Sequence, residues 1–257
     1  MNSGEWDTLE GDRIIVDFLS QGPVRSSGVV LRRNLDAEGN MSLYLLLKGI
    51  GPIWIQAPGS ARGRVRFGGG TEPLCWSVFD LYKGPKRLYL KSIDIKDDMW
   101  KLRLDPHLLL VALEWDKLII RYTCLGIAED NVLALFYWSM RTLCEGGDPP
   151  PLSWRFLWRW LHSRGEAPDL HSCEKCGTPL TSEVQWSETG FLCSSCYNDL
   201  HGLILSKQER LMLEAAALMD RRRFILFFSQ IAGRTGFDAE FWRAQSDRLK
   251  LILDRSR

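Results

Sequence analysis

The sequence has no long apolar run. Uninterrupted apolar stretches such as LLLVAL at residues 108–113 and FILFF at residues 224–228 are far shorter than the roughly 20 residues that cross a bilayer. The amino terminus, MNSGEWDTLEGD, is acidic and polar, and it has neither the basic region nor the apolar segment of a secretory signal. The sequence therefore predicts a cytoplasmic protein with no membrane partner.

The chain also lacks the cysteine pattern of a disulfide-bonded protein. It has seven cysteines, an odd number, and Cys75, Cys124 and Cys144 lie far apart in apolar surroundings that are typical of buried free thiols. Repeats and low-complexity tracts are missing, and the hydrophobic content of 45% with 25% charged residues is that of a globular protein. A chain of 257 residues is long enough for more than one hydrophobic core.

The small net charge of +1 conceals an uneven distribution. Residues 1–22 carry one arginine against five acidic residues, whereas residues 23–97 carry twelve lysines and arginines against six acidic residues. We therefore separate an acidic amino-terminal extension, residues 1–22, from a basic segment that follows it. A positive segment of this kind is a candidate surface for nucleic acid.

Residues 23–98 have the pattern of a small β-barrel. The expected strands are residues 27–33, 42–48, 51–57, 74–82 and 87–95, and a glycine-rich loop at 59–73 separates the third strand from the fourth. Five strands within about 75 residues suit a closed barrel, because closure removes exposed strand edges. We expect an OB-fold barrel that binds DNA over residues 23–98.

After Met99 the apolar period becomes helical. Start signals predict helices that open at Asp105 with Pro106, at Asp130, at Ser153, at Ser206 with Glu209, and at Asp238. Trp154, Trp158 and Leu161 recur at helical spacing and predict one buried face. The expected fold class is therefore β then α: the barrel, then a helical domain in two parts, residues 99–170 and 200–257, with an insertion at residues 171–199.

The insertion holds two Cys-x-x-Cys pairs separated by sixteen residues: Cys173 with Cys176 and Cys193 with Cys196. Two residues between cysteines let both thiolates reach one ion from a tight turn, and Gly177 allows the positive φ that such a turn commonly needs. Four thiolates fill a tetrahedral site and leave no open position for water. The spacing therefore predicts a four-cysteine zinc module with a structural role.

Three other interpretations of these cysteines stay open: unligated thiols, a redox pair and an iron-sulfur cluster. His171 and His201 lie close enough in sequence to replace a cysteine ligand, although surface histidines are the simpler interpretation. A catalytic zinc of the deaminase type needs a His-x-Glu sequence, and neither His107 nor His162 is followed by one.

The residues around the cysteines resemble a known family. GEAPDLHSCEKCG at 165–177 and GFLCSSC at 190–196 are similar to the RecO recombination mediators, in which a Gly-x-x-Pro-x-Leu segment precedes the first Cys-x-x-Cys-Gly and a glycine precedes the second pair. The order of barrel, helices, zinc insertion and helices also matches. The resemblance implies a bacterial, nucleoid-associated, non-enzymatic protein of DNA repair and recombination that binds single- and double-stranded DNA and anneals strands. It also implies RecR and single-strand-binding protein as partners in loading the recombinase.

The candidate DNA-binding residues are the basic residues of the predicted barrel. They fall mostly at strand ends and in connecting loops, where an OB-fold presents its ligand face. The candidates are Arg32, Arg33, Lys48, Arg62, Arg64, Arg66, Lys83, Lys86 and Arg87, with Lys91 beside them. Trp54, Phe67 and Trp76 are candidate stacking platforms for bases, with core packing as the alternative. For the cations the alternative is an ordinary solvated loop.

Two further functional hypotheses belong to other classes. The moderate charge and the acidic extension are compatible with a zinc-stabilised adaptor that contacts proteins and does not bind DNA directly. A metalloenzyme is the third hypothesis, and it would require an open coordination site. A DNA repair mediator with structural zinc is the interpretation that the charge distribution, the strand pattern and the cysteine pairs favour together.

Overall fold

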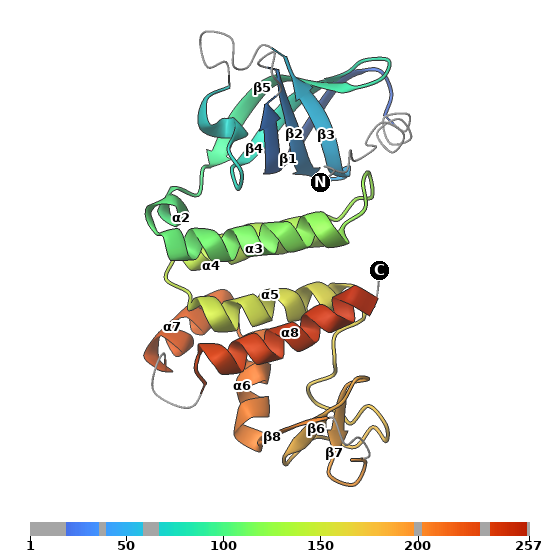
Figure 1. The fold of residues 1–257 in the computed structure, drawn as a ribbon, viewed down its shortest axis with the longest axis vertical. Coiled ribbons are helices and arrows are strands. Elements are labelled where there is room, and N and C mark those ends of the chain that lie inside the picture. Colours follow the sequence, from blue (N-terminus) through green and yellow to red (C-terminus); the bar gives the residue numbers. More distant parts are fainter. Residues whose placement is uncertain (1–18, 36–39, 59–66, 198–201, 232–236, 256–257) are drawn as a thin grey trace, which may run out of the picture. The chain divides into compact units, whose positions relative to one another are not determined.

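The computed structural model describes residues 19–35, 40–58, 67–197, 202–231 and 237–255. The chain forms two compact units, Met1–Arg141 and Thr142–Arg257, and strands precede helices as predicted (Figure 1). Within the described ranges, no helix combines the length and the apolar character that a membrane crossing requires. Most of the acidic extension lies outside the described residues.

The first unit begins with a closed five-stranded barrel. Its strands are β1 (Gly22–Leu35), β2 (Met41–Leu47), β3 (Gly51–Ala57), β4 (Trp76–Lys83) and β5 (Leu88–Asp97), and a short 3-10 turn, η1 (Gly68–Thr71), precedes β4. The strands are arranged in the order β1-β2-β3-β5-β4. Neighbouring strands are antiparallel except β3 and β5, which close the barrel in parallel. The five predicted strands are confirmed, although β1 begins at Gly22 rather than at Ser27.

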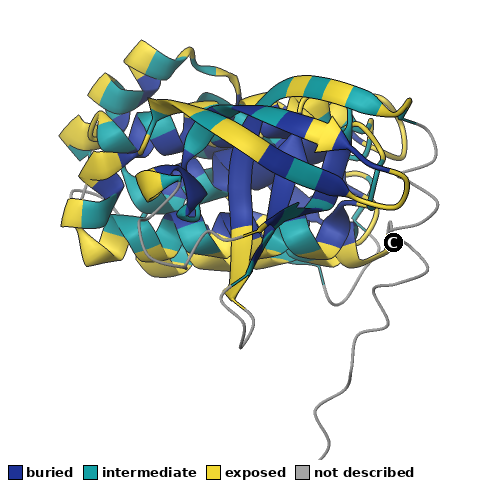
Figure 2. Ribbon diagram, turned by 90° about the horizontal axis from the view of Figure 1, so that it is seen from above, coloured by how far each residue is buried: buried dark blue, intermediate teal, exposed yellow. Residues whose placement is uncertain are grey.

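Apolar side chains fill the barrel. Residues along each strand alternate between the two faces of the sheet, and the inward positions of all five strands form one buried cluster that includes Val30, Leu43, Leu45, Ile55, Phe79, Leu81, Leu88 and Leu90. Figure 2 shows both buried and exposed positions along the strands. No residue of β2 or β3 is exposed, whereas β1 ends in four exposed residues and β5 is mostly exposed beyond Leu90. Because each strand is paired on both sides, short strands form a sheet without open edges.

Three helices follow the barrel: α2 (Trp100–Leu104), α3 (Pro106–Tyr122) and α4 (Asp130–Cys144). The α3 helix starts as predicted, because the Asp105 side chain accepts hydrogen bonds from the backbone N–H groups of His107 and Leu108. The α4 helix begins at the predicted Asp130, but this carboxylate accepts from the Gly49 N–H at 2.7 Å. Asp130 therefore links α4 to the turn between β2 and β3.

The turn between α3 and α4 lies against the start of β3. Gly51 has a φ of +90°, and an added Cβ would lie only 2.0 Å from the carbonyl oxygen of Ile127. The position therefore requires glycine for both its conformation and its close approach. Farther along the first unit, the rings of Trp76 on β4 and Tyr137 on α4 lie 4.6 Å apart between centroids. These contacts join the helices of this unit to the barrel wall.

The second unit contains α5 (Pro149–Ser163), α6 (Lys207–Leu218), α7 (Arg221–Ile231) and α8 (Ala239–Arg255), and a small sheet of β6 (Val184–Trp186), β7 (Phe191–Cys193) and β8 (Leu203–Leu205) in the order β7-β6-β8. The α5 helix lies alongside α8 and also packs against α6 (Figure 1). The predicted capping box of Ser206 and Glu209 opens α6. The α5 helix begins at Pro149 rather than at Ser153, because proline is favoured in a first turn, where its missing N–H leaves no bond unmade.

The α5 helix is buried on more than one face, whereas a single buried face was predicted. Trp154 and Trp160 are both fully buried, and Arg155 is 7% exposed. Arg155 donates to the carbonyl oxygens of Ala216 and Met219, each at 2.6 Å, and burial lowers its pKa to about 9. Arg159 donates to the carbonyl oxygen of Ala217 at 3.0 Å. Both arginines therefore satisfy carbonyls at the end of α6 that the helix itself leaves unpaired.

The three cysteines outside the Cys-x-x-Cys pairs differ in burial. All seven cysteines of the chain lie in described ranges, and none of them forms a disulfide. Cys75 is buried as predicted, but Cys144 is half-buried and Cys124 is exposed. Cys124 lies in the turn that follows α3, and its position is set by the helix end rather than by its apolar neighbours in sequence.

Candidate metal centre and nucleic-acid interface

The structure brings the two Cys-x-x-Cys pairs together. One sulfur from each of Cys173, Cys176, Cys193 and Cys196 forms a group whose members all lie within 4.8 Å of one another. The sulfurs of Cys176 and Cys193, one from each pair, are 3.7 Å apart. Cys173 is buried, Cys176 is exposed, and the other two are half-buried. Four sulfurs at these separations can hold a metal ion.

Backbone hydrogen bonds fold each pair into a tight turn. In the first pair the Gly177 N–H donates to the Cys173 carbonyl oxygen at 2.8 Å, and Gly177 has the expected positive φ of +71°. In the second pair the Cys196 N–H donates to the Cys193 carbonyl oxygen at 2.8 Å. The two turns thus bring their sulfurs into one group, as the spacing of the pairs predicts.

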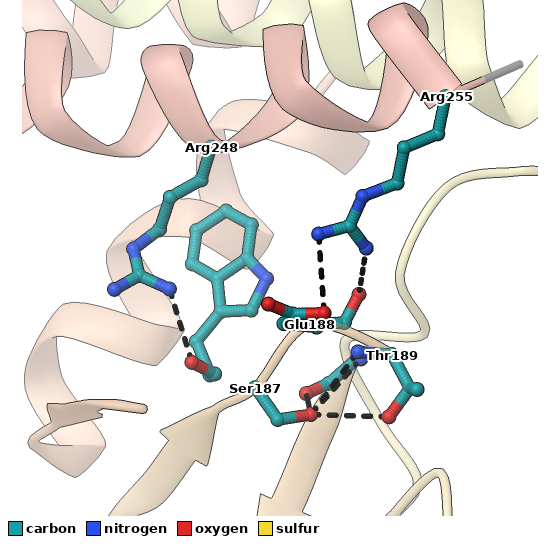
Figure 3. Close-up of polar contacts among 7 residues, drawn as sticks. Ser187, Glu188, Thr189, Arg248 and Arg255 are labelled. Atoms are coloured by element: carbon teal, nitrogen blue, oxygen red, sulfur yellow. Dashed lines mark hydrogen bonds and ion pairs between the residues drawn. The ribbon is translucent and has the colours of Figure 1, made fainter. Parts of the chain in front are cut away.

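A small sheet supports the two turns, and we call residues 171–197 together with β8 the cysteine module. The second pair begins on β7, which pairs with β6. The rings of Trp186 and Phe191, both buried, lie 4.9 Å apart between centroids and form an apolar core beside the sulfurs. At the turn between β6 and β7, the Ser187 hydroxyl donates to the Gly190 carbonyl oxygen at 2.8 Å (Figure 3).

Two arginines of α8 hold the edge of this module (Figure 3). Arg248 donates to the carbonyl oxygen of Trp186 at 3.1 Å, and its guanidinium lies 5.7 Å from the centroid of the indole ring. Arg255 donates to the carbonyl oxygen of Glu188 at 3.3 Å and forms an ion pair with the carboxylate of the same residue at 3.3 Å. The module is therefore attached to the last helix through backbone carbonyls at the end of β6.

The pKa values of Cys173 and Cys196 are shifted in opposite directions. Burial raises the pKa of the Cys173 thiol, but backbone hydrogen bonds at Cys193, Cys176 and Lys175 outweigh it and lower the pKa to about 6. The pKa of Cys196 is raised to about 12, chiefly by its side-chain contact with Cys176. The contacts among the sulfurs therefore make ionisation of Cys196 costly, and a bound cation would remove that cost.

His171 lies away from the sulfur group. Its Nδ1 is 3.8 Å from a carboxylate oxygen of Glu214 on α6, and the same carboxylate accepts from Arg210 at 2.9 Å. Arg210, 4% exposed, also donates to the Leu170 carbonyl oxygen at 2.9 Å and so fixes the start of the module. His201 lies outside the described residues.

The predicted DNA-binding cations are not all on one surface. Lys86 and Arg87 are exposed on the turn between β4 and β5, and Lys91 is exposed on β5. Lys48 directly follows β2. Ser42, near the other end of β2, pairs with Gln56 on β3, and Gln56 pairs with Tyr89 near the β4–β5 turn. Lys48 therefore lies at the end of β2 that is farther from this turn. Arg62, Arg64 and Arg66 lie outside the described residues. The structure therefore gathers only part of the predicted set, around the β4–β5 hairpin.

Three predicted cations on the barrel differ in their surroundings. Lys83, a predicted DNA-binding residue, is only 2% exposed, and its ammonium donates to the Gly84 carbonyl oxygen at 2.9 Å. The guanidinium of Arg33 forms an ion pair with Glu72. Arg32 is exposed but lies near enough to the buried Asp116 to lower its pKa, although burial dominates and raises that pKa to about 8. Lys83 and Arg33 therefore contribute less free positive charge to the surface than their number indicates, whereas Arg32 stays exposed.

The aromatic candidates have packing partners. The Trp54 ring lies 4.9 Å from the Tyr44 ring, and Trp76 packs on Tyr137 as described above. Phe67 is half-buried against the barrel core. Phe67 therefore agrees with the alternative of core packing, whereas Trp54 and Trp76 do not belong to the core cluster and pack on Tyr44 and Tyr137 instead.

Sequence reasoning missed the residues that position the cysteine module. Arg210 donates a hydrogen bond to the carbonyl oxygen of Leu170, which is 40 positions away in the sequence, and Arg248 donates to that of Trp186, which is 62 positions away. Neither contact leaves a local pattern, because the partners are backbone carbonyls that any residue supplies. The one available signal was the placement of basic residues on the apolar side of otherwise amphipathic helices.

A closed barrel with exposed cations on one hairpin, followed by helices and a tetracysteine module, defines a two-unit protein with a candidate metal centre. Residues 106–230 match the family model described as the recombination protein O C terminal. The chain is 29% identical over 188 residues to the DNA repair protein RecO of Acetivibrio thermocellus, which covers 72% of this chain and 75% of that protein. It is 25% identical over 203 residues to the DNA repair protein RecO of Exiguobacterium sibiricum, covering 77% and 81%.

A third relative, the DNA repair protein RecO of Desulforudis audaxviator, is 28% identical over 174 residues, or 67% of this chain and 70% of the relative. The family match contains both cysteine pairs, and the coverage of the relatives exceeds the family match in length. The family match and these relatives together support the RecO family for this chain.

Proposed function

We propose that this chain is a DNA repair and recombination mediator that binds single- and double-stranded DNA through its barrel and anneals complementary strands. In this proposal it works in the bacterial cytoplasm at the nucleoid, with RecR and single-strand-binding protein, and helps to load the recombinase. The observation that carries the proposal is the tetracysteine group inside a region that matches the recombination protein O family. The relatives' shared name, DNA repair protein RecO, supports it.

The barrel is the proposed DNA-binding element, and we infer that it is an OB-fold. Its five strands, their order β1-β2-β3-β5-β4 and the parallel closure of β3 with β5 support this inference. Lys86, Arg87 and Lys91 are exposed around one hairpin. Clustered cations neutralise phosphates and release counterions, which provides affinity without sequence preference.

We infer that the tetracysteine group holds a structural zinc ion. Four thiolates that surround zinc tetrahedrally at about 2.3 Å lie about 3.8 Å from one another, and Cys176 and Cys193 are 3.7 Å apart. The donor set fits zinc, because four sulfur ligands complete its coordination and leave no position for water. In this proposal zinc supplies folding free energy to the cysteine module, and the chain catalyses no reaction.

The test of DNA binding is an oligonucleotide titration by fluorescence anisotropy at about 50 and about 200 mM salt. We expect the logarithm of the affinity to fall linearly with the logarithm of the salt concentration. Replacing Lys86 and Arg87 with glutamine should reduce the slope by about 1.4 for a single strand, since each phosphate contact contributes about 0.7. The Lys207→Gln variant, which removes a charge from α6, should keep the wild-type slope.

A protein-interaction adaptor is the second candidate function. The ion pair of Arg33 with Glu72 and the burial of Lys83 favour it, because they reduce the free positive charge of the barrel. An adaptor shows no saturable binding of oligonucleotide at the lower salt concentration. That result would replace the mediator proposal with the adaptor.

A further inference from the structure

A row of polar and aromatic residues crosses the outer wall of the barrel. Strand register places Tyr82 on β4 opposite Tyr89 on β5, Tyr89 beside Gln56 on β3, and Gln56 opposite Ser42 on β2. Residues paired in this way have neighbouring Cβ atoms on the same face of a sheet. The Ser42 hydroxyl lies 3.2 Å from the side-chain oxygen of Gln56, which shows two members of the row in contact.

The two tyrosines point away from the barrel core. Their neighbours along the strands, Leu81, Leu88 and Leu90, are all at most 2% exposed and belong to the core cluster. Because side chains alternate along a strand, Tyr82 and Tyr89 lie on the outside. Tyr82 is 44% exposed, and the Tyr89 ring lies against the backbone of Gly84, where an added Cβ would come within 3.1 Å of a ring carbon. The glycine therefore leaves room for this ring over the hairpin turn.

Cations surround the tyrosine pair. The Lys91 ammonium lies 5.2 Å from the centroid of the Tyr82 ring, and Lys86 and Arg87 lie on the turn between the two tyrosines. Within the part of the chain that the structure describes, no carboxylate forms an ion pair with these three cations. Arg25, on the neighbouring strand β1, is paired with Asp80 at 3.1 Å. Free positive charge is thus concentrated beside one exposed and one half-buried tyrosine ring.

We propose that Tyr82 and Tyr89 form a base-stacking platform that selects single-stranded over double-stranded DNA, with Lys86, Arg87 and Lys91 on its phosphates. The inference rests on the proposed DNA-binding function and specifies which form of DNA this wall of the barrel binds. Bases of a duplex are stacked on one another and offer no free faces, whereas a single strand exposes faces that aromatic side chains bind. The hydroxyl and amide groups of Ser42 and Gln56 extend the same row with hydrogen-bonding groups for base edges.

Lys91 does not block the platform. A cation–π contact at an exposed site is weaker than the stacking of a base on an aromatic ring. An arriving base therefore displaces the ammonium from the Tyr82 ring, and the flexible lysine stem carries the charge to the adjacent phosphate. One residue thus covers the ring in the free protein and neutralises the strand in the complex.

The experiment compares the full-length wild type with the Tyr82→Leu/Tyr89→Leu double variant, which keeps apolar bulk and removes the rings. The probes are fluorescein-labelled (dT)20 and a duplex of the same length. We expect the double variant to bind (dT)20 at least about tenfold more weakly, as the loss of one stacked base implies. Its affinity for the duplex and its salt slope should change less than about twofold. The Tyr82→Phe/Tyr89→Phe variant should restore the affinity for (dT)20.

The outcomes separate this inference from the proposed function. If the Tyr→Leu variant keeps its affinity for (dT)20 while Lys86→Gln/Arg87→Gln lowers the salt slope, the barrel binds DNA and the platform is refuted. An equal loss of affinity for (dT)20 and for the duplex also refutes it, because stacking acts only on the single strand. If the wild type binds neither probe, both the platform and the proposed function are wrong.

Discussion

The barrel and the cysteine module are both small β-structures, but different forces hold them. The barrel closes five strands around a continuous apolar cluster, and its strand edges are all paired. The cysteine module has three strands of three residues each, and its core centres on Trp186 and Phe191. Sheets so short bury too little apolar surface to be stable alone. We therefore expect the module to depend on its four sulfurs and on the metal ion that they are proposed to hold.

This difference separates the functional roles as well. In the barrel the side chains that maintain the fold point inward, which leaves the outer wall free to carry Lys86, Arg87 and the tyrosine pair. In the module the cysteines are the proposed structural element. We therefore expect changes on the barrel wall to alter binding without loss of fold, and changes at the sulfurs to alter the fold of the module first.

The largest expected effect is at the sulfurs. Cys173→Ser should abolish stoichiometric metal and unfold the module, because structural zinc contributes on the order of 10 kcal/mol to such units. Metal analysis of the purified protein and limited proteolysis of residues 171–197 measure the two effects. The matched control is Cys124→Ser, which changes an exposed thiol outside the group and should retain the metal. Full metal content in the Cys173→Ser variant would contradict the proposal that the four sulfurs hold the metal and, with it, the module.

The second effect belongs to the barrel. Phe79 is fully buried in the core cluster, and Phe79→Ala should lower the free energy of unfolding of this unit by about 3 to 5 kcal/mol. Denaturant unfolding followed by circular dichroism measures the loss, and Phe79→Leu should cost less because the cavity is smaller. Metal content should stay at the wild-type value. A variant that lost metal together with barrel stability would show that one force holds both regions.

The two regions should also respond to pH in opposite directions. Burial raises the pKa of Asp116 from 3.8 to about 8, so the folded state binds more protons than the unfolded state between these values. The stability of the first unit should therefore fall as pH rises through this window, by up to about 1.4 kcal/mol per pH unit. Metal binding to thiolates instead weakens as pH falls.

Asp116→Asn tests the sign of this effect. The variant should unfold with a midpoint nearly independent of pH across this window, since the amide does not ionise. Glu114→Gln, on the same helix, should keep the wild-type slope. Stability that rose with pH in the wild-type first unit would contradict the assignment of Asp116 as a buried, mostly protonated carboxyl.

The smallest effects concern helix caps, of which each unit has a clear example. Asp105 caps α3 in the first unit, and Ser206 forms a capping box with Glu209 at α6 in the second. Asp105→Ala and Ser206→Ala should each cost about 1 kcal/mol. Thermal unfolding should show each loss in its own unit, with the other transition unmoved. Equal shifts of both transitions would indicate that the units unfold as one.

Local patterns in the sequence predicted the features that local physics determines. Alternating apolar residues located the five strands, and the spacing of the cysteine pairs located the sulfur group, because two-residue turns bring the sulfurs together. The caps at Asp105 and Ser206 are also local and were predicted. These features depend on residues within a few positions of one another.

Features that depend on distant partners could not be read in this way. The pairing of Arg33 with Glu72 spans 39 positions, and that of Arg248 with Trp186 spans 62. The burial of Lys83 depends on how the hairpin folds over its ammonium, which composition does not reveal. The cross-strand position of Tyr82 and Tyr89 follows from the strand register, and their symmetric placement two residues before and two residues after the turn at 84–87 was the signal available for it.

Hydrogen exchange of the full-length, metal-loaded protein with and without (dT)20 tests most directly whether the barrel binds DNA while the module serves the fold. We predict slower exchange on binding in β4 and β5, around Lys86 and Arg87, with no change at residues 171–197. Protection of the cysteine module with an unchanged β4–β5 hairpin would contradict the account, since it would place the DNA on the metal centre rather than on the barrel wall.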